Sequence, residues 1–161
     1  EEPVIIARTG WTTGELIDAL REKDPGNGFG LVTLLIGVNN QYRGLSISEY
    51  GKEFAFLLDE AIRFAGGSEE DVIVISIPDW GVTPFAAERD SEKIAREIDA
   101  FNALNRKISE AKGAAYVDIT GISRRASSEK DLVAPDGLHP SAEMYRRWTG
   151  ELVTVVKRIY H

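Results

Sequence analysis

The sequence of 161 residues contains no cysteine. This absence excludes disulfide bonds, zinc sites built from thiolates and a cysteine nucleophile. It does not fix the cellular compartment, because a chain without thiols is compatible with both oxidising and reducing surroundings.

Basic residues are scarce beside acidic ones, with 19 Lys and Arg against 26 Asp and Glu and a formal net charge of −7. Nucleic-acid binding depends on clustered Lys and Arg that neutralise phosphates, so we expect no nucleic-acid partner. The short basic pair Arg146-Arg147 is more simply the solvated face of a helix. No apolar run is long enough to span a membrane.

An initiator methionine is absent too, since the chain starts at Glu1. The next residues already have the pattern of a strand, so we expect that a segment before Glu1 has been removed or is not included. The lack of a signal peptide therefore leaves the localisation open between the cytoplasm and export with the signal removed.

The chain does contain enough apolar material for one core, with 43% hydrophobic residues, and we expect a single domain over residues 1–161. Short apolar runs alternate with amphipathic segments of helical period. The expected strands are residues 3–7, 31–36, 72–77 and 115–119, and the expected helices follow a capping box at 12–15 and then cover 48–65, 91–112 and 141–160. This order predicts a parallel sheet between two layers of helices, a three-layer α/β/α fold.

Reactive groups in such folds lie in the loops at the carboxyl ends of the strands. Here those loops are residues 8–12, 37–44, 78–90 and the stretch from 120 to 139. Four segments that are far apart in the sequence are therefore expected to converge on one crevice.

The last of these loops places the only internal histidine, His139, three residues after Asp136. In a turn, this spacing lets the carboxylate bind one imidazole nitrogen, which fixes the tautomer and leaves the other nitrogen free to act as a base. Asp-Gly is also a common turn dipeptide, so a capped turn with a surface histidine is the alternative.

Two other loops begin with candidate donors to a developing oxyanion. Asn39 follows a strand directly and would present its amide NH₂ at the carboxyl edge, beside a glycine that permits close approach. Gly10 ends the first predicted strand, and its N–H is a second candidate donor. The alternatives are a loop asparagine bound to its own backbone and a tight strand-to-helix turn.

Together these segments resemble the SGNH hydrolases, the GDSL-type esterases and lipases, over essentially the whole chain. The matching blocks, in order, are Gly10, Gly37-Val38-Asn39-Asn40 and Asp136-Gly137-Leu138-His139-Pro140. The resemblance implies a flavodoxin-like α/β/α fold and ester hydrolysis that needs no cofactor and no metal. It also implies that His139 is the general base, Asp136 its orienting carboxylate, and Asn39 and the Gly10 N–H the oxyanion-hole donors.

The sequence departs from this family at two places. Asn40 stands where the family usually has Asp, which should alter local loop hydrogen bonding with little effect on the chemistry. The larger departure is the Gly-Asp-Ser block that carries the nucleophile, which is absent. Serines that lack this context include Ser46, Ser68, Ser76, Ser91, Ser123 and Ser141.

Because the family places its serine after the first strand, we expect the nucleophile upstream of Glu1. The missing piece would be a βα unit on the order of 30 residues or more. Its loss would also remove a central strand, so the fold is expected to be N-terminally incomplete, with the absent segment as a partner of this chain.

Aromatic residues accompany the predicted crevice: Trp80 and Phe85 follow the strand at 72–77, and Trp11 and Tyr42 lie in the two preceding loops. They either form the wall of an acyl or sugar pocket or merely cover the edge of the sheet.

We expect a serine esterase that acts on short-chain acyl or acetyl esters, including acetylated carbohydrate, through an acyl-enzyme. One alternative is a non-catalytic module that binds a small molecule or carbohydrate on the same fold, because no nucleophile is present and fold does not guarantee function. A metal-dependent hydrolase built on Asp79, Asp118, Asp136 and His139 is a weaker alternative, since these residues lack diagnostic spacing.

Overall fold

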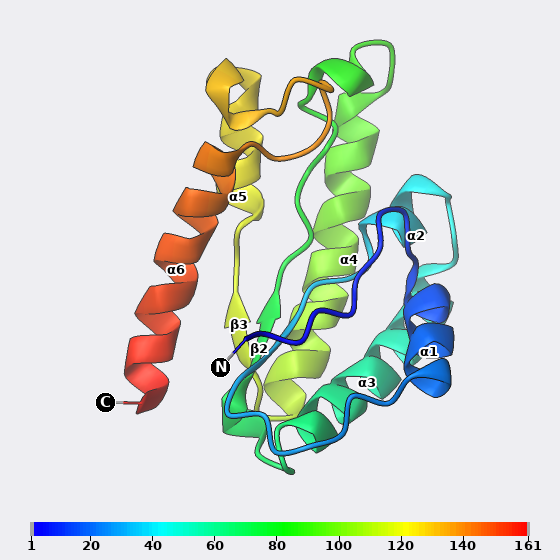
Figure 1. Ribbon diagram of the computed structural model, residues 1–161. Coiled ribbons are helices and arrows are strands. Elements are labelled where there is room, and N and C mark those ends of the chain that lie inside the picture. Colours follow the sequence, from blue (N-terminus) through cyan, green and yellow to red (C-terminus); the bar gives the residue numbers. More distant parts are fainter. Residues whose placement is uncertain (1, 161) are drawn as a thin grey trace.

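The computed structural model describes residues 2–160 and contains a parallel sheet covered by helices (Figure 1). The strands β1 (Val32–Leu34), β2 (Val72–Ile75) and β3 (Ala115–Val117) lie in the order β1-β2-β3. The α-helices are α1 (Thr13–Glu22), α2 (Val38–Tyr42), α3 (Ile47–Phe64), α4 (Ser91–Ala111), α5 (Thr120–Arg124) and α6 (Ala142–Tyr160). The predicted α/β fold with a parallel sheet is confirmed.

Alternating side chains of β2 supply the two halves of the core. Val72 and Val74 pack with α1, α3 and α4, where Tyr50, Phe54 and Leu58 are buried. Ile73 points to the other face and packs with residues of β3 and α6, including Trp148. Both faces are covered because parallel strands place helices on each side, and this explains why the strand reads as a continuous apolar run. Figure 1 shows α6 on the opposite side of the sheet from α3 and α4.

Side-chain caps determine where the long helices begin. The predicted capping box is present at α1, where the Thr12 side chain accepts from Glu15 N and Glu15 accepts from Thr12 N. Ser46 caps α3, and Asp90 caps α4 by accepting from Lys93 N. Each cap satisfies a backbone N–H that has no partner inside its helix.

The strand predicted at residues 3–7 is wrong. This segment is extended but belongs to no sheet, and Val4 and Ile5 are exposed. A strand requires a neighbour at hydrogen-bonding distance. Ile6, Ala7 and Arg8 instead line a cavity together with Leu35 and Ile36 at the end of β1, and no ladder forms there.

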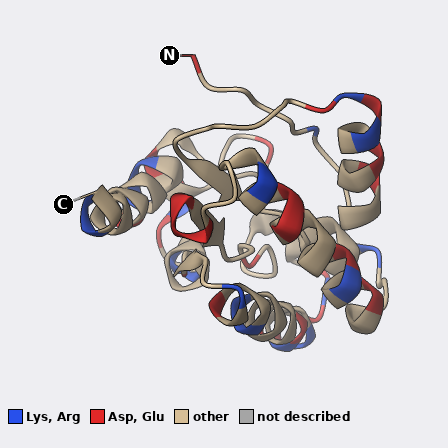
Figure 2. Cartoon of the chain, turned by 90° about the horizontal axis from the view of Figure 1, so that it is seen from below, with Lys and Arg blue, Asp and Glu red and all other residues tan. Residues whose placement is uncertain are grey.

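The helices carry charges of both signs on their outer surfaces, and in the view of Figure 2 Lys and Arg are interspersed with Asp and Glu. Arg146 and Arg147 both bind Glu143, at 2.6 and 2.9 Å, so this basic pair is paired with acid on its own helix. Of the helices in residues 2–160, none has the length and the apolar character needed to cross a membrane.

An ion pair between a buried carboxylate and a partly exposed guanidinium binds the loop after β2 to α5. Asp79 is fully buried as a side chain, and its two oxygens accept from Arg124 Nε at 2.9 Å and from Gly81 N at 2.8 Å. Asp79 N donates to Ser123 Oγ at 2.9 Å. The loop that carries Trp80 is thus anchored at its first residues.

Arg124→Met should lower the free energy of unfolding by roughly 3 kcal/mol, because it leaves the Asp79 carboxylate buried without its counter-charge. Arg21→Met is the matched control, since Arg21 pairs with Asp18 on an exposed helix surface and should contribute less than about 0.5 kcal/mol. Urea unfolding followed by tryptophan fluorescence measures both variants. Equal losses would show that Asp79 does not depend on Arg124.

Candidate functional site

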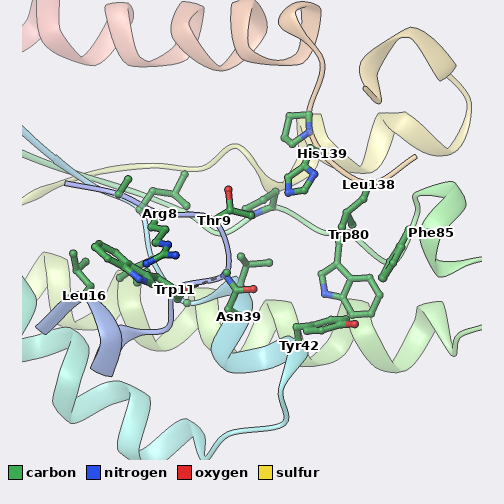
Figure 3. A pocket seen from close by; sticks show the side chains of 18 of the residues that line it. Arg8, Thr9, Trp11, Leu16, Asn39, Tyr42, Trp80, Phe85, Leu138 and His139 are labelled. Atoms are coloured by element: carbon green, nitrogen blue, oxygen red, sulfur yellow. Dashed lines mark hydrogen bonds between the residues drawn. The ribbon is translucent and has the colours of Figure 1, made fainter. Parts of the chain in front are cut away.

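A cavity of about 440 Å³ lies at the carboxyl edge of the sheet, lined by residues of the N-terminal segment, the end of β1, the loop after β2 and the turn before α6 (Figure 3). The structure places seven of the eight predicted site residues around it: Gly10, Trp11, Asn39, Tyr42, Trp80, Phe85 and His139. The eighth, Asp136, contacts His139. Loops separated by up to about 130 positions therefore meet at one place, as parallel strands with a common carboxyl edge require.

Asp136 and His139 form a close pair in the turn before α6. His139 Nδ1 lies 2.6 Å from Asp136 Oδ2, and the backbone N–H groups of Leu138 and His139 both donate to Asp136 Oδ1 at 2.9 Å. These two backbone donors, and to a smaller extent the imidazole, lower the pKa of Asp136 from its ordinary value to about 2. Both side chains are about half exposed, at 51% and 54%.

The turn itself is built from backbone bonds and one glycine. Gly137 has a φ of +76°, which a residue with a Cβ rarely adopts. Ala134 N donates to His139 O at 2.8 Å, which closes the turn, and Gly137 O accepts from Phe85 N at 3.0 Å. The loop after β2 is therefore bound directly to the turn that carries His139.

Asn39 lies in the first turn of α2, directly beyond the end of β1. Gly37 reverses the chain there with a φ of +129°, and a Cβ at Gly37 would stand 2.6 Å from the Tyr50 ring, so no larger residue fits. Tyr50 Oη donates to Ile36 O at 3.2 Å beneath the same turn. One N–H of the Asn39 amide donates to Trp11 O at 3.0 Å, which leaves its second N–H for another acceptor.

Gly10 faces α2 from the N-terminal segment, with a φ of +90°. Its carbonyl oxygen accepts from Arg43 Nη2 at 2.6 Å. Within residues 2–160 no protein group accepts from the Gly10 N–H. The two candidate oxyanion donors thus come from segments that contact each other.

Three aromatic side chains pack together on one wall of the cavity. The ring centroids of Tyr42 and Trp80 are 5.2 Å apart, and Phe85 lies 6.1 Å from Trp80 and 6.3 Å from Tyr42. Trp80 is buried and donates from Nε1 to Gln41 Oε1 at 2.7 Å. Phe85 and Tyr42 remain partly exposed, so they are free to contact a ligand. Trp11 lines another part of the cavity.

The carboxylates of the metal-site alternative are each bound elsewhere. Asp79 pairs with Arg124, and Asp118 accepts from Ser76 Oγ and Thr120 N. In the part of the chain from 2 to 160, no group of three or more His, Asp and Glu side chains is arranged to bind a metal ion.

Sequence reasoning missed the residues that position the site. Asn40 binds Thr13, Gln41 binds Trp80, and Arg43 binds Gly10 O, all from α2 or its C-terminal end. A five-residue helix is too short for an apolar period, so α2 was not predicted. The available signal was the run of amide residues after Gly37, whose side chains bind backbone and side-chain groups far away in the sequence rather than their own loop.

No serine lines the cavity among the described residues, and Thr9 is the only aliphatic hydroxyl there. Ser76, one of the serines considered above, is fully buried and bonded to Thr120 Oγ1 and Ile119 N. Ser123 is buried against Thr120 O and Asp79 N.

Several solved structures are similar to this chain. LAE5, described as an α/β hydrolase enzyme from the metagenome of Lake Arreo, Spain, has a TM-score of 0.72 at 18% identity, over 93% of this chain and 70% of that one. The lipase/acylhydrolase from Enterococcus faecalis has a TM-score of 0.68 at 19% identity, over 92% and 71%. The esterase EstA from Pseudoalteromonas sp. has a TM-score of 0.61 at 19% identity, over 92% and 73%. These likenesses show the fold.

Comparison with curated proteins finds no match. The model of the GDSL-like lipase/acylhydrolase family, however, matches residues 1–147. That range contains every segment around the cavity, from Gly10 to His139, and most of the chain. This chain belongs to the GDSL-like lipase/acylhydrolase family.

Proposed function

We propose that the site hydrolyses short-chain acyl or acetyl esters through an acyl-enzyme, with the nucleophilic serine supplied by a segment outside these 161 residues. Membership of a family of lipases and acylhydrolases supports ester hydrolysis in general. The observation that carries the proposal is the meeting of the Asp136–His139 pair, Asn39 and Gly10 around one cavity. This set contains a base, its orienting group and two amide donors.

His139 is the proposed general base. Asp136 occupies Nδ1, so Nε2 is the nitrogen that accepts the proton of the serine hydroxyl as its oxygen attacks the ester carbonyl. The Asp136 carboxylate stabilises the imidazolium that results. His139 then gives the proton to the leaving alcohol, and a water molecule activated in the same way releases the acid.

Asn39 and Gly10 are the proposed donors to the oxyanion of each tetrahedral intermediate. The free amide N–H of Asn39 and the backbone N–H of Gly10 belong to segments already bound to each other. Donors placed before the reaction stabilise the developing charge without reorganisation, and each is worth on the order of 100- to 1000-fold in kcat.

The cavity also offers a place for a serine-bearing segment. Ile6 and Ala7 line it together with Leu35 and Ile36, and among the described residues β1 pairs only with β2. Leu31 and Leu35, which flank β1, are exposed apolar residues at this edge of the sheet. A strand inserted there would pair with β1 and cover these side chains. The matched structures are longer than this chain, which covers 70% to 73% of three of them.

A non-catalytic binding module is the second candidate, and the absence of a serine among the lining residues of the described chain favours it. In that case the aromatic wall of Tyr42, Trp80 and Phe85 binds a small molecule or sugar and no bond is broken. Ester hydrolysis measured with and without a serine-bearing segment separates the two functions.

Residues 1–161 alone should not hydrolyse p-nitrophenyl acetate above a trace rate, because removal of a triad nucleophile costs on the order of a million-fold in kcat. Joining the chain to the segment encoded before Glu1, or adding that segment as a separate peptide, should restore hydrolysis. We call this combination the serine-bearing protein. A phosphonate ester should then label the new serine, as detected by mass spectrometry.

Thr9→Val is the control for the same assay, because Thr9 has the only aliphatic hydroxyl in the cavity lining. Strong activity of residues 1–161 that Thr9→Val abolishes would overturn the assignment of the nucleophile. Inactivity of the serine-bearing protein with every ester tested would favour the binding module.

Asp136→Asn should lower kcat of the serine-bearing protein roughly 1000- to 10,000-fold with little change in KM, because the amide promotes the wrong imidazole tautomer. Asp131→Asn is a suitable control, since Asp131 lies in the same connection and does not line the cavity. Steady-state kinetics on p-nitrophenyl acetate measure both. An unchanged kcat in Asp136→Asn would remove this residue from the mechanism.

The lowered pKa of Asp136, about 2, has a consequence for the pH profile. The folded chain keeps this carboxylate ionised where the unfolded chain binds a proton, so its contribution to stability is present above about pH 4 and is lost as the pH falls toward 2. The free energy of unfolding should therefore fall as the pH drops below about 4, and Asp136→Asn should remove this part of the fall. Urea unfolding at several pH values, followed by tryptophan fluorescence, tests this with Asp131→Asn as the control, and an unchanged acid dependence in Asp136→Asn would contradict the lowered pKa.

A further inference from the structure

Side chains of α2 and of Arg43 directly after it bind the segment 10–13 across 27 to 33 positions of sequence. Asn40, which is only 1% exposed, uses both ends of its amide on Thr13: Oδ1 accepts from Thr13 N at 3.0 Å, and Nδ2 donates to Thr13 Oγ1 at 2.6 Å. Asn39 and Arg43 add the bonds to Trp11 O and Gly10 O. Figure 3 shows the Asn39 bond at the floor of the cavity.

The placement of Gly10 depends on these bonds. Before Gly10, residues 3–9 are in no sheet, and the one backbone bond near this end joins Trp11 N to Arg8 O. After Gly10, α1 begins at Thr13, and the N–H and the hydroxyl of Thr13 both form hydrogen bonds with the Asn40 amide. The position of the Gly10 N–H relative to Asn39 is therefore set from the side of α2.

The direction of the hydrogen bonds at Thr13 explains why residue 40 is an asparagine. Thr13 Oγ1 donates its single proton to Glu53 Oε2 in α3. The group on the other side of this hydroxyl must therefore be a donor, and the Asn40 NH₂ is one. An aspartate at 40 would place an acceptor there and add a second negative charge beside Glu53.

We propose that Asn40 is a positioning residue, which acts through Thr13 and Glu53 to set the Gly10 N–H beside the Asn39 amide in the oxyanion hole. The proposal rests on the oxyanion roles given above and identifies what aligns the two donors. It reverses the sequence-based expectation that the residue at 40 has little effect on the chemistry.

The test exchanges donor and acceptor on the two sides of the Thr13 hydroxyl, which now donates to Glu53 and accepts from Asn40. Asn40→Asp leaves an oxygen facing the Thr13 hydroxyl, so the proton of Thr13 has two competing acceptors. Adding Glu53→Gln supplies an NH₂ on the other side, so that Thr13 donates to Asp and accepts from Gln. The single variant should lower Tm by about 5 °C, and the double variant should recover most of that loss.

The effect of Asn40→Asp on catalysis is measured in the serine-bearing protein. Asn40→Asp should lower kcat roughly 10- to 100-fold with KM changed less than about twofold, because a displaced donor weakens transition-state binding more than substrate binding. Glu53→Gln should restore kcat when combined with it. In an Asn39→Ala background, Asn40→Asp should have little further effect, whereas a purely structural role gives additive losses.

Nuclear magnetic resonance of residues 1–161 gives a readout that needs no activity. The Gly10 amide and Asn39 side-chain resonances should shift in Asn40→Asp and return in the double variant. Ile73→Val is the matched control, because it removes a methyl group from the core on the α6 side of the sheet. It should lower Tm while leaving both sets of resonances and kcat unchanged. Thr13→Val compared with Thr13→Ser repeats the test without adding a charge.

Unshifted Gly10 and Asn39 resonances in Asn40→Asp would overturn the proposal, and so would a loss of kcat that Glu53→Gln does not recover. If the wild-type serine-bearing protein hydrolyses no ester, the proposed function fails, and the resonances alone then decide whether Asn40 positions Gly10.

Discussion

The site depends on one constraint: three parallel strands end at the same edge of the sheet, and the polar groups of the chain beyond them must find partners. The pairs Leu34↔Val74 and Ile75↔Val117 set this edge. Beyond β2, the Asn102 side chain accepts from Ile77 N at 2.8 Å and donates to Ile77 O at 3.0 Å. A side chain of α4 thus replaces the strand neighbour that the ladder no longer provides, and the loop leaves the core with its backbone satisfied.

Apolar patterns predicted the elements whose stability comes from burial. The runs at 31–36, 72–77 and 115–119 contain the observed strands, and the long helices begin within two residues of their predicted starts. The pattern failed where polar groups are buried. On α4, Asn102, Asn105 and Ser109 are buried alongside Ile94 and Ile98, because they bond to loop backbone, to Tyr50 Oη and to their own helix. Hydrophobicity alone carries no signal for such contacts.

The error at residues 3–7 has a different origin. A strand is a relation between two segments, and local composition reports only one of them. Val4, Ile5 and Ile6 have the β-branched composition of a strand, but Val4 and Ile5 are exposed and Ile6 lines the cavity beside the end of β1 without pairing to it. The site residues were easier to locate, because Asp136 and His139 bond within one turn and Asn39 follows its strand directly.

The two sides of the cavity are positioned by separate sets of bonds. On the side of the base, Asp79–Arg124 anchors the loop after β2, and Phe85 N then binds Gly137 O in the turn of His139. On the side of the proposed donors, Asn39 and Asn40 of α2 and the following Arg43 bind the segment that contains Gly10, and Glu53 of α3 adds a bond to Thr13. A carboxylate buried beside its counter-charge tolerates little change, whereas a segment bound outside the sheet by side-chain hydrogen bonds moves at lower cost. The turn that carries His139, the proposed base, is therefore the more firmly fixed side of this site. The alignment of Gly10 and Asn39, the proposed oxyanion donors, is the property most sensitive to the sequence of α2 and to whatever occupies the cavity.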